Sequence, residues 1–216
     1  MRAVAAVACL TLLGGAPAMG ADGLDTSAAG ADAGTSAIEQ AYRAGKAASD
    51  EREARRCFQR GIDLARQQLG ATADAPGALL WLAANLAGEA LTHGRLFALK
   101  VIPEIESTLL RLDQLHPTYD HAAAARALAN LYWKAPALIS VGSSKKASRY
   151  FEVALQRAPG FPGNQAMAAA YFAARGDCGR ARPLAEAVNA NVDLDSFGSD
   201  AAEWRRLARG ALADCD

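Results

Sequence analysis

The chain has 216 residues, of which 51% are hydrophobic and 21% are charged, and its formal net charge at pH 7 is zero. This length fits one domain or slightly more, and the abundance of alanine favours helices over strands. The balanced charge argues against a nucleic-acid-binding protein, and the lack of a basic tract argues against binding to an anionic membrane surface.

Residues 1–20 predict a secretory signal peptide. Arg2 supplies a short positive region, residues 3–13 form an apolar run too short to span a bilayer, and small residues suited to a peptidase follow at 16–20. The alternative is an alanine-rich tail that stays attached. Lipid attachment at Cys9 is not expected, because lipoprotein signals usually carry a larger aliphatic residue three places before the cysteine. We therefore expect an exported, periplasmic protein.

Residues 21–37 are rich in small and polar types, lack a periodic apolar face and are expected to form a flexible segment. A helical domain is predicted over residues 38–216. Its apolar residues recur three and four positions apart, which is typical of amphipathic helices that each bury one stripe. About eight helices are expected, and their apolar faces span residues 54–65, 79–90, 102–112, 124–135, 147–155, 167–174, 181–188 and 204–212. The predicted fold class is therefore all-α.

The C-terminal half of the helical domain has a regular repeat. Ala147 and Ala181 are 34 positions apart, and Phe151 and Ala154 lie between them at helical spacing. Small residues recur where two helices must touch closely, and an aromatic side chain fills the gap. This pattern is typical of a tetratricopeptide repeat (TPR), a helix hairpin that stacks on copies of itself to form a solenoid. Such arrays usually bind other molecules rather than transform them.

One interval departs from the repeat. Tyr132 and Ala147 are fifteen positions apart where an ideal repeat has nine, so residues 134–144 are expected to contain an extra loop. Insertions of this kind lie on one face of the array and often carry function. Ser143 or Ser144 is the expected N-cap of the helix that follows, and the alternative is an anion site at that helix N-terminus.

Three cysteines remain after signal cleavage. Cys178 lies in the turn of a repeat and Cys215 lies next to the C-terminus, so in an oxidising compartment these two are expected to form a disulfide that ties the last helix to the array. Cys57 lies beside Phe58 on an apolar helix face and is expected to be buried. The alternative is that all three are free thiols.

Two groups of aromatic and polar residues fall on helix positions that face the concave groove of a TPR array. The first group is Trp81 and Asn85, and the second is Arg126, Asn130 and Trp133. Aromatic walls with amide and guanidinium donors suit a ligand or an extended peptide, so the two groups are predicted to line a common groove. The alternative is that the tryptophans pack between helices and the asparagines bond locally.

The sequence predicts a non-enzymatic protein without a cofactor. It lacks a G-x-S-x-G elbow, an H-E-x-x-H motif and a phosphate-binding glycine loop. No CxxC pair is present, and the three histidines, His93, His116 and His121, lack the spacing of a metal site. Surface or capping roles are expected for these histidines.

Six stretches of the chain carry a family resemblance, from PGALLWLAAN to PGFPGN. They are residues 76–85, 103–105, 115–120, 126–136, 142–147 and 159–164. In this order they resemble the T component (TatT-like) family associated with tripartite, TRAP-type periplasmic transporters, which is a tetratricopeptide-like family. The chain differs from the family pattern in the signal before Cys9 and at Ser143, which stands where an acidic residue or a second glycine usually follows Gly142.

The resemblance implies an exported helical-repeat protein that docks a periplasmic solute-binding protein. It further implies a small apolar ligand in a central cleft and a trimeric assembly in some members, and it adds Tyr132 to the candidate groove residues. The leading hypothesis is therefore a non-enzymatic periplasmic scaffold or adaptor associated with a TRAP-type solute transporter. The alternative is a general adaptor in cell-envelope assembly with protein or peptide partners.

Overall fold

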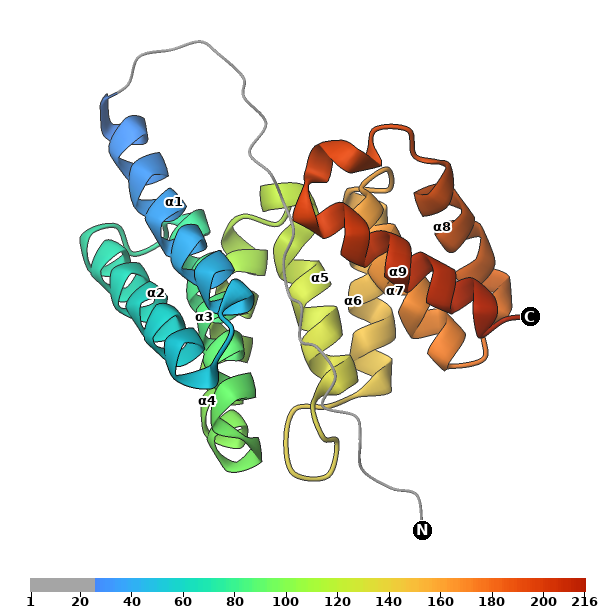
Figure 1. The fold of residues 1–216 in the computed structure, drawn as a ribbon, viewed down its shortest axis with the longest axis horizontal. Coiled ribbons are helices and arrows are strands. Elements are labelled where there is room, and N and C mark those ends of the chain that lie inside the picture. The colour runs from blue at the N-terminus through green and yellow to red at the C-terminus, as the bar shows by residue number, and fades with distance from the viewer. Residues whose placement is uncertain (1–25) are drawn as a thin grey trace. The chain divides into compact units, whose positions relative to one another are not determined.

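The computed structural model describes residues 26–216, with side chains from Gly34 onward. These residues form nine α-helices and a short 3₁₀ helix, η1, without a strand (Figure 1). The elements are α1 (Thr26–Ala47), α2 (Glu51–Ala71), α3 (Pro76–His93), α4 (Arg95–Leu115), α5 (Tyr119–Lys134), α6 (Ser144–Arg157), α7 (Pro162–Ala174), α8 (Cys178–Ala190), η1 (Leu194–Phe197) and α9 (Ser199–Ala213). The predicted all-α fold is confirmed.

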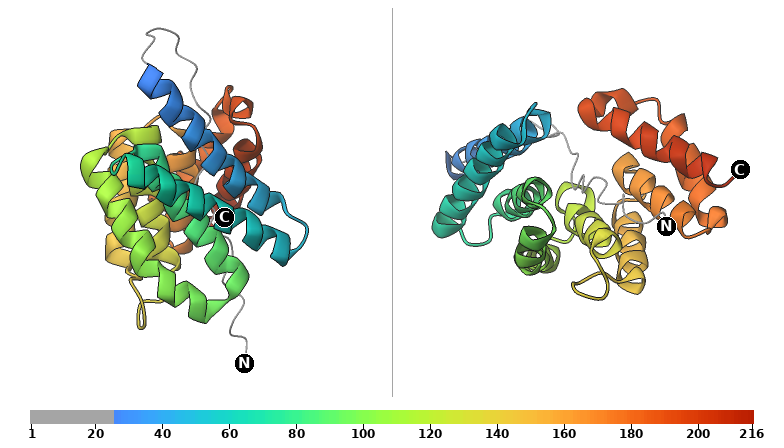
Figure 2. Two further views of the ribbon diagram at one scale, coloured as in Figure 1. Left: turned by 90° about the vertical axis from the view of Figure 1, so that its left-hand side faces the viewer. Right: turned by 60° about the horizontal axis from the view of Figure 1, so that its bottom comes forward.

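The described chain divides into two compact units. Unit 1 contains α1 to α4 together with the loop residues 134–142, and unit 2 contains α5 to α9 with η1. Consecutive helices pack together from α1 to α4 in unit 1 and from α6 to α9 in unit 2, and Figure 2 shows the helices from two sides.

Helix α3 is the central helix of unit 1. It packs against α1, α2 and α4, and every residue from Gly77 to Ala90 is buried. Pro76 occupies its first turn, where the missing N–H leaves no helical hydrogen bond unmade. The ring of Phe58 from α2 lies where a Cβ on Gly45 of α1 or on Gly88 of α3 would collide with it. Glycine at these two positions therefore lets three helices close around one aromatic side chain.

Helix α7 is the central helix of unit 2 and packs against α6, α8 and α9. Small residues allow close approach elsewhere in this unit, since Ala122 and Ala125 of α5 form a buried cluster with Ala154 of α6. Helix α6 begins as the sequence predicted. Ser143 is its N-cap, and its hydroxyl accepts a hydrogen bond from the backbone N–H of Lys146 at 3.3 Å.

A disulfide joins Cys178 at the start of α8 to Cys215 beyond the end of α9, with the two Cα atoms 5.5 Å apart. Arg182 reinforces this junction, because its guanidinium donates to the carbonyl of Cys215 at 2.9 Å and to the carboxylate of Asp216 at 3.0 Å. Cys57 is a free thiol that is half-buried rather than buried, since it lies at the edge of the apolar stripe of α2.

The first helix differs from the sequence prediction. Helix α1 begins at Thr26, so residues 26–37 are helical although a flexible segment was expected. The sequence there shows no apolar period, but its alanines support a helix without one. The predicted signal peptide and Cys9 lie outside the described residues. Over residues 26–216, no helix combines the length and the apolar character needed to cross a bilayer.

Candidate functional site

The first group of predicted groove residues lies inside unit 1. Trp81 is 4% exposed, and its ring lies 5.5 Å from that of Tyr42 in α1. Asn85 is fully buried and its amide donates to the carbonyl oxygens of Trp81, at 2.7 Å, and Ile38, at 3.4 Å. Its amide also fills the space beside Gly61 of α2, where a Cβ would collide with it. Both side chains therefore hold α3 against its neighbours.

The second group of predicted groove residues lies in unit 2. Asn130 is 7% exposed and donates to the carbonyl of Arg126, at 3.1 Å, and to the Met167 sulfur. Tyr132 is buried, and the half-buried ring of Trp133 makes edge contacts with Phe151 and Tyr171. These contacts match the alternative in which the side chains pack or bond locally. The two groups lie in different units, so the common groove between them stays a prediction.

Arg126 is the centre of a buried polar network in unit 2. Its side chain is fully buried, and Nη1 donates to Oδ1 of Asn164 on α7 at 2.8 Å and to the carbonyl of His121 at 3.3 Å. Nη2 lies 3.6 Å from the carboxylate of Asp120, and the guanidinium lies over the ring of Phe161, 4.8 Å from its centroid. Burial holds the pKa of Arg126 below its usual range, and the negative charges of Asp120 and Asp200 oppose that shift.

This network holds a strained turn at the start of α5. Asp120, His121 and Ala122 all have left-handed backbone angles, with φ of 44°, 55° and 62°. Such angles cost about 1–2 kcal/mol per non-glycine residue. The carbonyl of His121 accepts from both Arg126 and the fully buried Asn164, at 3.3 and 3.1 Å. The hydrogen bonds to that carbonyl therefore offset part of the strain, and the buried arginine has a structural task.

A pocket of about 570 Å³ opens between α2 and α3 in unit 1. Its lining residues are Arg55, Arg56, Gln59, Arg60, Asp63, Leu64 and Gln67 of α2 and Glu89 and His93 of α3. Pockets that bind small ligands commonly measure about 300–1,000 Å³. This pocket therefore has the size of a ligand site, although its lining is mostly polar.

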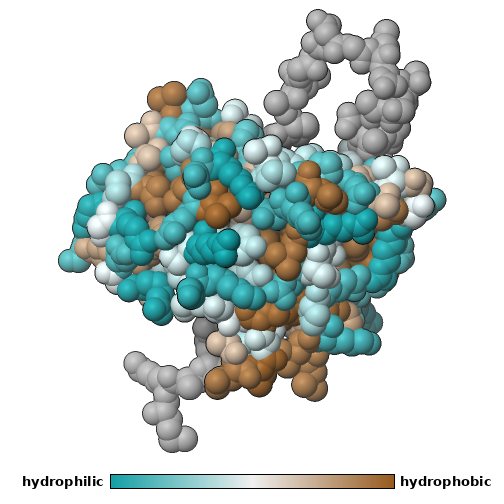
Figure 3. All heavy atoms as spheres, turned by 180° about the vertical axis from the view of Figure 1, so that it is seen from behind, coloured by the Kyte–Doolittle hydropathy of each residue, from teal (hydrophilic) through white to brown (hydrophobic). Residues whose placement is uncertain are grey.

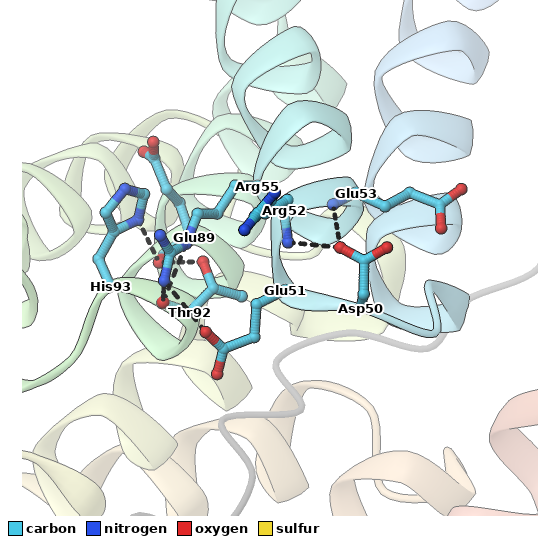
Figure 4. A network of polar contacts seen from close by, with 8 residues as sticks. All are labelled: Asp50, Glu51, Arg52, Glu53, Arg55, Glu89, Thr92 and His93. Carbon is cyan, nitrogen blue, oxygen red and sulfur yellow. Dashed lines mark hydrogen bonds and ion pairs between the residues drawn. The ribbon is translucent and has the colours of Figure 1, made fainter.

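One end of the pocket is built by the network in Figure 4. The guanidinium of Arg55 donates to the carbonyl of Thr92 through Nε, at 3.0 Å, and through Nη2, and it also reaches the carboxylate of Glu51 at 3.2 Å. The hydroxyl of Thr92 donates to the carbonyl of Glu89 at 2.8 Å. These bonds join the N-terminal part of α2 to the C-terminal end of α3 and fix the shape of the pocket.

The carboxylate of Glu89 and the guanidinium of Arg60 take no part in the bonds that join α2 to α3. Glu89 is 8% exposed, and over the described residues its carboxylate makes no hydrogen bond or ion pair. Burial raises the pKa of Glu89, while the positive charges of His93 and Arg66 lower it and Asp63 raises it further. Arg60 is exposed and has no polar partner in the described part of the chain.

A second pocket, of about 350 Å³, lies in unit 2 between α6 and the α7–α8 turn. Its most prominent cation, Arg180, donates to Asp177 at 2.6 Å and to Glu152 at 3.0 Å, and it lies 4.0 Å from the ring centroid of Phe172. The hydroxyl of Tyr171 donates to the carbonyl of Ser144 at 2.8 Å. Because these groups satisfy one another, this pocket is a weaker candidate for binding.

The extra loop predicted within residues 134–144 connects α5 to α6, and its residues 135–141 form an apolar projection. Its base is closed by a 2.9 Å hydrogen bond from the N–H of Ser143 to the carbonyl of Tyr132. At its tip, Leu138 is 98% exposed and Ile139 is 67% exposed. Figure 3 shows hydrophobic side chains exposed along the lower edge of one face of the molecule. The loop therefore offers apolar surface that the described residues leave uncovered.

The sequence prediction did not include the α2–α3 pocket. A usable signal was present, because Arg52, Arg55, Arg56 and Arg60 are concentrated within nine residues of a chain whose net charge is zero. Over residues 26–216, no group of three or more His, Cys, Asp or Glu side chains could hold a metal ion.

Comparison with known proteins identifies the fold. No protein-family model matches the chain, and no curated protein matches it. A solved structure that does match is the crystal structure of a thermophilic TPR protein in Thermus thermophilus. The two are 19% identical with a TM-score of 0.51, over 83% of this chain and 86% of that chain. This protein thus has an all-α, TPR-like helical-repeat fold.

Proposed function

We propose that this protein is a non-enzymatic periplasmic scaffold whose partner is the solute-binding protein of a tripartite, TRAP-type transporter. The TPR-like fold supports the scaffold role, because stacked helix hairpins present extended surfaces for binding. The order of sequence motifs from residue 76 to residue 164 supports the choice of partner, through its resemblance to the T component family.

The observation that carries the proposal is the apolar tip of the loop at residues 135–141. Leu138 and Ile139 are adjacent and largely exposed, and burying an aliphatic side chain of this size stabilises a contact by about 1.5–3 kcal/mol. The loop is closed at its base, and Pro136 restricts its backbone. A restrained loop loses less conformational entropy when a partner covers it.

The test is capture of partners from a native envelope extract with the purified chain as bait and mass spectrometry as readout. The variant Leu138→Ser with Ile139→Ser removes the apolar tip. Val192→Ser is the matched control, because Val192 is also 91% exposed but lies in the connection between α8 and η1. Both variants change exposed side chains, so neither should alter folding by more than about 0.5 kcal/mol.

We expect the unaltered chain and Val192→Ser to capture a solute-binding protein, and the loop variant to lose it. Equal capture by all three chains would show that the loop is not the contact. Capture of envelope-assembly or secretion proteins without a solute-binding protein would replace the transporter partner with the general adaptor role.

A further inference from the structure

We propose that the pocket between α2 and α3 binds a short acidic peptide by its free amino terminus, with the ammonium on Glu89 and the acidic groups on Arg56 and Arg60. This is a ligand site that the scaffold role does not require, and it involves neither the apolar loop nor unit 2.

The carboxylate of Glu89 in the pocket wall is the first observation. Glu89 lines the pocket and is 8% exposed, yet Figure 4 draws no contact to its carboxylate, which extends away from the bonds between Arg55 and Thr92. The carboxylate oxygens therefore face the pocket without a partner from the described residues. An ammonium carries three donors on a compact positive charge, so it satisfies such a carboxylate in a small space.

Neighbouring side chains do not take this role for Glu89. Arg66 attracts Glu89 at a distance, but its guanidinium donates to Glu104 of α4 at 2.8 Å. Asp63 repels Glu89 and accepts a hydrogen bond from Gln59 at 2.9 Å. His93 attracts Glu89 as well, but its ring Nδ1 lies 3.2 Å from the backbone carbonyl of Glu89 and not on its carboxylate. The carboxylate of Glu89 is therefore open to a donor that enters the pocket.

The two exposed arginines are the second observation. Arg56 and Arg60 are one helical turn apart on α2, and both line the pocket. In the part of the chain that the structure describes, Arg60 has no polar partner, and Arg56 has only a long-range attraction to Asp50. Arg55 differs, because Thr92 and Glu51 already occupy its guanidinium. A planar guanidinium matches a carboxylate with two parallel hydrogen bonds.

The charges of the pocket that lack close partners indicate which charges the ligand carries. One carboxylate and two exposed cations without close partners line the same pocket, so the complementary ligand carries one cation and two anions. A pocket of about 570 Å³ has room for several residues of peptide. The amino terminus of an acidic peptide supplies one ammonium followed by carboxylates. A free oligopeptide and the amino-terminal segment of a protein share this chemistry.

The test is calorimetric titration of the purified chain with the tripeptide Ala-Glu-Asp. We expect saturable binding that weakens about tenfold or more when the tripeptide is N-acetylated, because a charge-assisted hydrogen bond is lost. Binding of the neutral tripeptide Ala-Gln-Asn should be weaker by a similar factor. These two probes need no variant, so they test the site without any change in the protein.

Variants then test which residues bind the amino terminus and which bind the acidic groups of the tripeptide. Glu89→Gln should reduce the preference for the free over the acetylated tripeptide, and Arg56→Gln with Arg60→Gln should reduce the preference for the acidic over the neutral one. Arg52→Gln is the matched control, since Arg52 is exposed on the same helix but does not line the pocket. Equal binding of free and acetylated tripeptide, an equal loss in Arg52→Gln, or no saturable binding would overturn the proposal.

A fourth probe separates the two sources of ligand. The tripeptide is extended at its carboxyl end with a Gly-Ser tail. Equal binding of the extended peptide assigns the site to the amino terminus of a protein, and binding of the short peptide alone assigns it to free oligopeptides. Both results support the site.

Discussion

The two units of this protein place their charges in opposite ways. In unit 2, Arg126 is fully buried, its Nη1 donates to Asn164 and His121, and its guanidinium lies over the ring of Phe161. Its Nε and Nη2 have no hydrogen-bond partner in the described residues, and Nη2 faces the carboxylate of Asp120 at 3.6 Å. In unit 1, Arg60 and the carboxylate of Glu89 face a pocket without a partner in the described residues. Both units consist of packed helix hairpins, so the helical architecture does not explain the difference.

Some charges of this protein act within the fold, which makes them structural, and others remain available to a ligand. A buried charge persists when surrounding groups satisfy it, and removing one of those groups is then severely destabilising. A charge at the wall of a pocket can be neutralised by a ligand instead. Strong burial of Arg126 therefore indicates a role in folding unit 2, while the unused charges of the α2–α3 pocket indicate binding.

The largest expected effect comes from Arg126→Met. The change leaves Asp120 and Asp200 without their buried cation and removes the hydrogen bond from Arg126 to the carbonyl of His121 in the strained turn, so it should destabilise unit 2 by about 3–5 kcal/mol. Denaturant unfolding followed by circular dichroism measures this loss. The control is Arg60→Met, an exposed change expected to alter stability by less than about 0.5 kcal/mol. Equal stability of the two variants would remove the distinction between structural and available charge.

A smaller loss is expected when the disulfide of unit 2 is removed. Replacing both Cys178 and Cys215 with Ser should cost about 2–4 kcal/mol, because the cross-link between α8 and α9 limits the unfolded chain. Thermal unfolding of the unaltered protein in dithiothreitol should then approach that of the double variant. Cys57→Ser controls for the free thiol. Insensitivity of the unaltered protein to dithiothreitol would contradict a stabilising disulfide.

The smallest expected effect tests the pocket through pH. Because burial raises the pKa of Glu89, its protonated form stabilises the fold below the usual carboxyl pKa, and that stabilisation is lost as pH rises through the raised pKa. Glu89→Gln stays neutral, so we expect it to be more stable than the unaltered protein at pH 7. The difference should shrink in acid, where Glu89 is protonated beside Asp63, Arg66 and His93. Thermal unfolding at several pH values measures it, and a pH-independent difference would mean that Glu89 is satisfied internally.

The sequence predicted most of the fold because helical periodicity is a local signal. The apolar stripes of α2 to α9 and the N-cap at Ser143 were all present in short stretches of sequence. Helix α1 was missed, since none of the eight predicted apolar faces lies in residues 26–47, and residues 26–37 have helix-favouring alanines but no apolar stripe. The left-handed turn at Asp120 was also missed, since its sequence contains no glycine to indicate it.

The candidate site was less predictable because burial depends on residues distant in sequence. Arg126 was placed in a groove by its helix position, but Asn164 and Phe161, more than thirty residues away, enclose its guanidinium. Glu89 was not singled out, because its burial arises from the packing of α3 against α2. The position of a residue along its helix could not show that Arg126 is enclosed within unit 2 while Glu89 lines a pocket.

Hydrogen exchange of the full chain with and without saturating Ala-Glu-Asp tests the central claim most directly. We predict slower exchange in α2 and α3, around residues 55–67 and 89–93, with no change in α5 or α7 of unit 2. Protection centred on Arg126 and Asn164, or no protection in either unit, would contradict the assignment of the available charges to unit 1.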